Sequence, residues 1–221
     1  MTTGLNHVRP GGPPLVVRLS TSVTMTKISV GPMDNNAYLL QSGTGATVLI
    51  DAANDSDRLL KLINDQPLNT IVTTHRHGDH WHGLAAVAEA TGARLVAGRP
   101  DVDAITQGAK VHGLVGVWDG DEIELGHESL AVIGLVGHTP GSITLAYAGG
   151  RTTHLFTGDS LFPGGPGKTH SPQDFTSLMD DLEAKIFGRF DDAAVVHPGH
   201  GDDTTLGVER PHLGEWRQRG W

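Results

Sequence analysis

The residues from 74 to 80, Thr-His-Arg-His-Gly-Asp-His, constrain this chain more than any other stretch. They follow a β-branched apolar run at 70–73 and precede a helix-like run at 84–90, so they occupy the loop after a strand. Four of their side chains are of the types that zinc, iron and manganese accept as ligands: His75, His77, Asp79 and His80. A tight loop cannot bring all four to one tetrahedral ion. The pattern therefore favours two ligand sets on two adjacent metal ions.

Length and composition bound the class of protein. The 221 residues suffice for one well-buried domain, which we assign to residues 15–221, preceded by a flexible Gly/Pro-rich arm at 1–14. The net charge is −9 and no basic block is present, which argues against nucleic acid as a partner. The absence of cysteine excludes disulfides, thiolate metal sites and cysteine nucleophiles.

No apolar run approaches the ~20 residues that span a bilayer, and no secretory signal is evident, so we expect a cytoplasmic protein without membrane association.

Strand-like runs outnumber helix-like runs along the chain. Strands are expected at 15–19, 24–30, 36–41, 47–51, 70–74, 94–97, within 111–136, and at 142–148, 152–157 and 193–196. Helices are expected at 56–63, 84–91, 100–106 and from 171 to about 187. The early strands predict an antiparallel sheet. Neither strand-rich half can leave both faces of its sheet exposed to solvent. We therefore predict an α+β fold in which two sheets face each other with helices outside.

Three further candidate ligands stand where predicted strands end: His138, Asp159 and His200. Each is bracketed by glycine or proline, which lets the backbone turn sharply and a ligand approach closely. Together with the opening motif they make seven nitrogen and oxygen ligands. We expect them to converge at one end of the sandwich.

In this order the seven residues resemble those of the metallo-β-lactamase-fold hydrolases, over roughly residues 24–209. The resemblance implies an αββα four-layer sandwich with two divalent ions at its edge, zinc by expectation, although iron and manganese accept the same ligands. It also implies a division of the ligands. One ion would be held by His75, His77 and His138, the other by Asp79, His80 and His200, and Asp159 would bridge both.

Two positions allow alternative interpretations. Asp51 closes a predicted strand, where a carboxylate can cap a helix or support the metal ligands. The resembling family has an aspartate at the end of an early strand, which favours the supporting role. His197 competes with His200 for the last ligand role, and the flanking glycines of His200 match the family better. His82 is expected near the rim of the site, at the start of a helix.

Within the superfamily, the segments 33–40, 137–142 and 156–162 resemble those of glyoxalase II-type enzymes, which hydrolyse S-lactoylglutathione and related acyl-thiols. The resemblance implies attack by a metal-bound hydroxide that Asp79 also orients, with no side-chain nucleophile. Lys168 and His170, in the loop after Asp159, are the expected substrate contacts. Only some twenty residues follow His200, so we expect a short form without the C-terminal helical domain.

Two other activities of the same scaffold are alternatives. A persulfide dioxygenase would use one mononuclear iron and need not fill the second site. A lactonase or β-lactamase-like hydrolase would use the same metals on a cyclic ester or amide. Under each of these hypotheses the partner is a small-molecule substrate.

Overall fold

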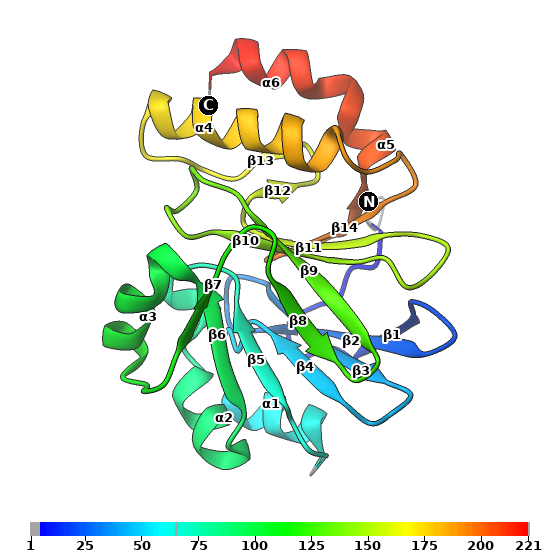
Figure 1. Ribbon diagram of the computed structural model, residues 1–221, viewed down its shortest axis with the longest axis vertical. Coiled ribbons are helices and arrows are strands. Elements are labelled where there is room, and N and C mark those ends of the chain that lie inside the picture. Colours follow the sequence, from blue (N-terminus) through cyan, green and yellow to red (C-terminus); the bar gives the residue numbers. More distant parts are fainter. Residues whose placement is uncertain (1–4, 65, 221) are drawn as a thin grey trace.

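The computed structural model describes residues 5–64 and 66–220. Two β-sheets pack face to face, and helices cover both outer faces (Figure 1). The predicted α+β, αββα four-layer architecture is therefore confirmed. Residues 1–4 of the predicted arm, together with residues 65 and 221, lie outside the described residues.

The first sheet has seven strands in the order β1-β2-β3-β4-β5-β6-β7. Its strands are β1 (Leu15–Arg18), β2 (Val23–Val30), β3 (Asn35–Ser42), β4 (Thr47–Ile50), β5 (Thr70–Thr73), β6 (Arg94–Gly98) and β7 (Val115–Val117). Pairing is antiparallel from β1 to β4, as predicted, and parallel from β4 to β7. Parallel pairing requires a crossover connection, and each crossover here contains a helix. These helices are α1 (Ser56–Ile63), α2 (Leu84–Thr91) and α3 (Val102–Ala109).

The second sheet has six strands in the order β15-β14-β11-β10-β9-β8. They are β8 (Glu122–Leu125), β9 (Glu128–Gly134), β10 (Ile143–Tyr147), β11 (His154–Gly158), β14 (Val195–Pro198) and β15 (Thr204–Thr205). β11 and β14 run parallel and are connected through α4 (Pro172–Asp181) and a π-helical continuation, η3 (Leu182–Phe187). Helix α4 begins as the sequence predicts, because Ser171 accepts a hydrogen bond from the Asp174 amide and Pro172 occupies the first turn.

The remaining elements are short. The Gly/Pro-rich segment after Asp159 contains a two-stranded ribbon, β12 (Leu161–Phe162) with β13 (Gly165–Pro166). The tail forms α5 (Leu206–Glu209) and α6 (Leu213–Arg219). Short 3-10 turns are η1 (Gly78–His80), η2 (Arg99–Asp101) and η4 (Arg210–His212).

Three apolar clusters hold the four layers together. The central cluster lies between the sheets and includes Tyr38, Leu145 and Phe156. A second cluster joins the first sheet to α1, α2 and α3, and a third joins the second sheet to α4 and α6, where Trp216 is buried. In Figure 1 these helices lie at opposite ends of the stack of layers. Because both faces of each sheet are covered, the sandwich edges are left to carry the polar chemistry.

The segment before β1 contacts the body of the domain. Leu5 pairs with Asp203, Val8 is buried, and Arg58 donates a hydrogen bond to the Gly12 carbonyl. Within the described residues, no helix has both the length and the apolar character needed to cross a membrane.

Strand direction positions the candidate ligands. β4 and β5 run parallel in the first sheet, and β11 and β14 run parallel in the second. Parallel strands end at the same edge of a sheet, so the residues that follow them become neighbours. Asp51 follows β4, His75 follows β5, Asp159 follows β11 and His200 comes two residues after β14. The same edge of the sandwich thus receives residues that are far apart in sequence.

Candidate metal centre

The structure brings all seven predicted ligands together at this edge. Their metal-binding atoms form three overlapping groups in which every pair of atoms lies within 4.8 Å. The groups are His75 with His77 and His138, His75 with His80 and Asp159, and Asp79 with His80 and His200. The first and third groups coincide with the two ligand sets that the sequence resemblance implies.

The first group directs three imidazole nitrogens at one another. His138 Nε2 lies 3.2 Å from His75 Nε2 and 3.0 Å from His77 Nδ1. His138 donates from Nδ1 to the Lys168 carbonyl oxygen at 2.7 Å, so its Nε2 carries a lone pair when the ring is neutral. Thr74 donates its hydroxyl proton to Asp51 and can accept from His75 Nδ1 at 3.1 Å, which leaves His75 Nε2 as a second lone pair.

Burial disfavours the charged form of these three rings. It is the largest cause that lowers the pKa of His75 well below its usual value, and neighbouring His80 adds to the effect. The pKa values of His77 and His138 are lowered in the same way. Neutral lone pairs facing one another repel unless a cation lies between them. The donor set therefore fits a divalent metal ion.

The second group has the same construction with a carboxylate in place of one ring. His80 Nδ1 lies 2.8 Å from Asp51 Oδ2, and His200 Nδ1 lies 2.9 Å from the Met33 carbonyl oxygen. Both rings thus direct Nε2 into the site, 3.2 Å apart. Asp79 Oδ2 lies 3.3 Å from His200 Nε2 and accepts a 2.9 Å hydrogen bond from Asn35. Partners that fix ring orientation in this way are typical of metal-binding histidines.

Asp159 lies between the two groups. Its carboxylate oxygens are 3.3 Å from His80 Nε2, 3.4 Å from His200 Nε2 and 3.7 Å from His138 Nε2. Its Oδ1 is buried and accepts no hydrogen bond from any described residue. A buried carboxylate oxygen without a donor is costly, and a metal ion would satisfy it. The structure thus fits the bridging role predicted for Asp159.

Without a cation, protons balance the charge of the second group. Burial alone would lower the pKa of His80, but the Asp159 and Asp51 carboxylates raise it well above its usual value. For His200, hydrogen bonds to Asp159 and Asp79 overcome burial and raise the pKa to about 10. The pKa of Asp159 is held well below its usual range by His80 and His200, against the effect of burial. A metal ion must displace these protons to bind.

Gly199 is required for the close approach of the ligands. A Cβ atom built on Gly199 would lie 2.2 Å from Asp159 Oδ1 and 2.5 Å from His80 Cε1. Contacts this short would force the bridging carboxylate or the His80 ring out of place. The dense packing of the centre therefore requires glycine at the position before His200.

The other predicted residues lie around the centre. Asp51 accepts hydrogen bonds from the amide and hydroxyl of Thr74 and faces His80. Lys168 and His170 are exposed at the rim, and the His170 ring centroid lies 6.3 Å from that of His77. His82 is exposed and belongs to none of the ligand groups. His197 lies away from the ligands, hydrogen-bonded to His154 and Asp203.

Sequence reasoning missed three supporting residues. Asn35 orients Asp79, and Thr74 connects Asp51 to the first metal-binding group. Asp101 is fully buried and accepts hydrogen bonds from the Arg76 amide, the Thr139 hydroxyl and the Gly141 amide, which ties the two ligand loops together. Asn35 stood in a segment that resembled glyoxalase II. Asp101 gave no signal, because its partners lie far away in sequence.

A family model described as the metallo-beta-lactamase superfamily matches residues 30–203, a range that contains all seven converging side chains. The chain belongs to this superfamily. Hydroxyacylglutathione hydrolase from Anaeromyxobacter dehalogenans is 34% identical over 174 residues, which cover 76% of this chain and 61% of that protein. The chain thus spans less than two thirds of that relative's length.

Two further similarities cover most of the other protein. Hydroxyacylglutathione hydrolase GloC from Haemophilus influenzae is 26% identical over 200 residues, covering 83% of this chain and 93% of that protein. The crystal structure of TTHA1623 in a di-iron-bound form matches with a TM-score of 0.69 and 29% identity, covering 83% of this chain and 96% of that one.

Gly199→Ala tests the packing of the metal centre. The added methyl group displaces Asp159 or His80, so we expect bound metal to fall below about one tenth of the wild-type content while the fold is retained. Metal analysis and circular dichroism measure the two effects. Gly214→Ala is the matched control, because no atom lies within 4 Å of a Cβ built there. Full metal content in Gly199→Ala would contradict the assigned geometry.

The pKa shifts predict that metal binding depends on pH. The pKa of His200 is raised to about 10, so at neutral pH its ring holds a proton that the metal must displace. Each displaced proton makes affinity rise by up to about tenfold per pH unit below that pKa. We expect affinity to increase steadily from about pH 6 to about pH 9. Chelator competition measures the affinity, and an unchanged affinity over this range would refute the shift.

Proposed function

We propose that the protein is a dinuclear metallo-hydrolase that cleaves an acyl-thiol ester, of which S-lactoylglutathione is the test substrate. The observation that carries the proposal is the pair of adjacent ligand groups with Asp159 between them. Two relatives named hydroxyacylglutathione hydrolase support the choice of a thioester. The di-iron state of a similar structure supports two ions, with iron or zinc as candidates.

Two divalent ions held in such a site lower the pKa of a bound water and polarise a carbonyl oxygen. The chain's own residues supply orientation. Asn35 donates hydrogen bonds to both the side chain and the backbone carbonyl of Asp79, which fixes the direction of its carboxylate. Asp79 is partly exposed, with a side chain 19% accessible, so it can accept a hydrogen bond from a water in the site. A thioester has a good leaving group, and no nucleophilic side chain is needed.

The rim of the centre offers cations to an anionic substrate. Arg76, between two metal-binding histidines, is exposed, and its guanidinium has no hydrogen bond or ion pair within residues 5–64 and 66–220. It lines a cavity of about 330 Å³ that also contains His138, His170 and Asp174. Asp174 is engaged in capping α4, where it accepts from the Ser171 hydroxyl at 2.7 Å. Arg76 and the exposed Lys168 are therefore the groups we assign to the acid groups of the thiol carrier.

Asp159→Ala and His75→Ala test the proposed chemistry. Each removes a ligand, so we expect metal content to fall and hydrolysis of S-lactoylglutathione to drop by at least about a thousandfold. Asp103→Ala, which removes an exposed carboxylate in α3, is the control and keeps full activity. Metal analysis and release of free thiol are the measurements.

The same assay separates the alternative activities. Wild-type protein with two metals per chain and no hydrolysis of any acyl-thiol would refute the thioesterase proposal. One iron per chain with oxygen uptake on glutathione persulfide would identify a dioxygenase instead. Hydrolysis of a lactone or β-lactam alone would place the chain among the hydrolases of cyclic substrates.

Arg76→Gln tests recognition of the substrate's acid group. Loss of one charge-assisted hydrogen bond is worth roughly 1.4 kcal/mol, so we expect KM for S-lactoylglutathione to rise about tenfold with little change in kcat. A neutral thioester should be hydrolysed equally well by both proteins. Arg99→Gln is the control, because Arg99 is an exposed arginine that lies 3.8 Å from Asp121. Equal KM values for wild type and Arg76→Gln would mean that another residue recognises the acid group of the substrate.

A further inference from the structure

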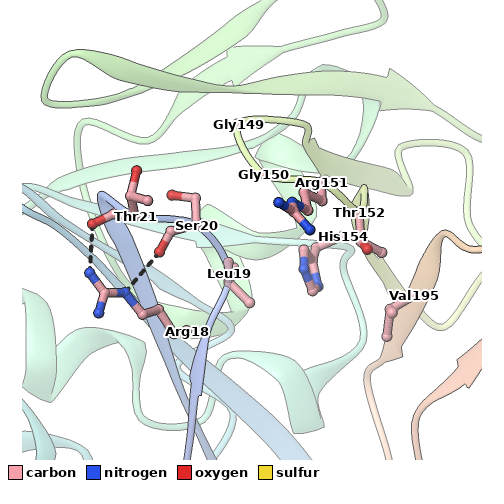
Figure 2. Close-up of a pocket in the computed structure, with 10 residues that line it drawn as sticks. All are labelled: Arg18, Leu19, Ser20, Thr21, Gly149, Gly150, Arg151, Thr152, His154 and Val195. Atoms are coloured by element: carbon pink, nitrogen blue, oxygen red, sulfur yellow. Dashed lines mark hydrogen bonds between the residues drawn. The ribbon is translucent and has the colours of Figure 1, made fainter.

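A large cavity lies at the end of the sandwich opposite the metal centre. Its volume is about 630 Å³, and we call it the basal cavity. Its walls are the β1–β2 turn at 18–21, the β10–β11 turn at 149–152, and the first residues of β11 and β14 (Figure 2). Those two residues, His154 and Val195, are cross-strand partners, whereas the metal ligands follow the far ends of the same strands. The basal cavity is therefore a separate site.

The walls of the basal cavity are held in place before any ligand binds. Ser20 Oγ lies 2.8 Å from the Tyr147 hydroxyl, which ties the β1–β2 turn to β10. A Cβ built on Gly150 would lie 2.3 Å from the Leu19 carbonyl oxygen, so the two turns are in direct contact. Arg18 braces its own turn by donating to the carbonyl oxygens of Ser20 and Thr21, as the dashed lines of Figure 2 show.

The basal cavity is positively charged in a protein of net charge −9. Arg18 and Arg151 line it, and no carboxylate does among the described residues. The Arg151 guanidinium makes no hydrogen bond or ion pair within the described ranges, 5–64 and 66–220. Glu128, whose Oε2 lies beside Gly149, is outside this lining, and its Oε1 accepts from the Ser22 hydroxyl at 2.5 Å. An unpaired guanidinium over a preformed cavity favours an oxyanion.

A buried polar chain determines what else the basal cavity presents. His154 is 8% exposed, and its Nδ1 lies 3.0 Å from His197 Nε2. His197 Nδ1 lies 2.8 Å from Asp203 Oδ2, and Lys27 donates to the other oxygen of Asp203 at 2.7 Å. The opposite nitrogen, His154 Nε2, has no hydrogen-bond partner in the described part of the chain. Figure 2 shows the His154 ring beside Arg151 on one wall of the cavity.

The chain fixes the tautomer of His154. The Asp203 carboxylate accepts the proton of His197 Nδ1, and in the neutral ring His197 Nε2 is then an acceptor. His154 therefore donates from Nδ1, and its Nε2 keeps a lone pair. A second proton is unfavourable there, because burial and neighbouring His197 lower the pKa of His154 to about 4. The buried Lys27 already balances the charge of Asp203, so no net negative charge remains to hold an imidazolium.

We propose that the basal cavity binds a small oxyanion that also carries a hydroxyl group, the chemistry shared by hydrogen phosphate and 2-hydroxycarboxylates. The Arg151 guanidinium holds the anionic oxygens, and His154 Nε2 accepts a hydrogen bond from the ligand hydroxyl. Specificity comes from the second contact, because a simple anion cannot donate a hydrogen bond to the Nε2 lone pair. The inference is independent of the proposed thioesterase activity.

The test follows the chemical shifts of the His154 ring nitrogens by NMR in the metal-loaded protein. This signal is local to the basal cavity, so anions that bind at the metal centre do not contribute to it. Probes are glycolate, acetate and inorganic phosphate at about pH 7, added to about 10 mM. We expect glycolate, phosphate or both to shift the Nε2 signal, and acetate, which lacks the hydroxyl, to bind about fivefold to tenfold more weakly. A response to phosphate alone would identify a phosphate as the ligand, and a response to glycolate alone would identify a 2-hydroxycarboxylate.

Arg151→Gln should abolish the shift, and because Arg151 is exposed in a turn, the variant keeps its fold. Arg99→Gln, outside the basal cavity, should leave it unchanged. In His154→Phe, which lacks the reporting ring, titration calorimetry should show glycolate and acetate binding with equal affinity. Three results would overturn the proposal. They are no shift of Nε2 with either glycolate or phosphate, a shift that persists in Arg151→Gln, and binding of acetate to the wild-type protein with the same affinity as glycolate.

Discussion

Repulsion among converging lone pairs is the constraint on which the metal-binding edge depends. His75 and His138 each use Nδ1 against a fixed oxygen partner, and their Nε2 atoms are held 3.2 Å apart. Such an arrangement is unfavourable in a buried site unless positive charge lies between the nitrogens. On the other side of Asp159, protons on His80 and His200 supply that charge when no metal is present. The surrounding structure must therefore hold the ligands in place for a cation.

The sandwich meets this demand through strand ends and buried hydrogen bonds. Parallel pairs in both sheets deliver ligands to one edge, and Asp51 supports both groups, directly at His80 and through Thr74 at His75. Asp101 joins the loop of Arg76 to that of Thr139. The opposite edge carries a different polar chain, in which His197 takes a structural position between His154 and Asp203. One fold thus places the converging ligand groups and the basal cavity at opposite ends.

Residue spacing predicted which side chains converge, because metal chemistry restricts both residue type and backbone. His138, Asp159 and His200 each stand beside glycine or proline after a strand, and that local pattern survives in the fold. Long-range partners leave no such pattern. Asp101 and Asn35 contact residues 25 to 44 positions away, and Asp203 joins Lys27 across the sheets. The parallel extension of the first sheet was also missed, because it depends on how helices cross over rather than on strand composition.

Anomalous X-ray diffraction from crystals of the metal-loaded protein would locate the bound ions. At the absorption edge of the bound metal, a dinuclear centre should give two peaks at the sandwich edge. One should lie within reach of His75, His77 and His138, the other within reach of Asp79, His80 and His200, with Asp159 between them. A single peak, or peaks that do not contact these residues, would contradict a dinuclear centre built on this motif.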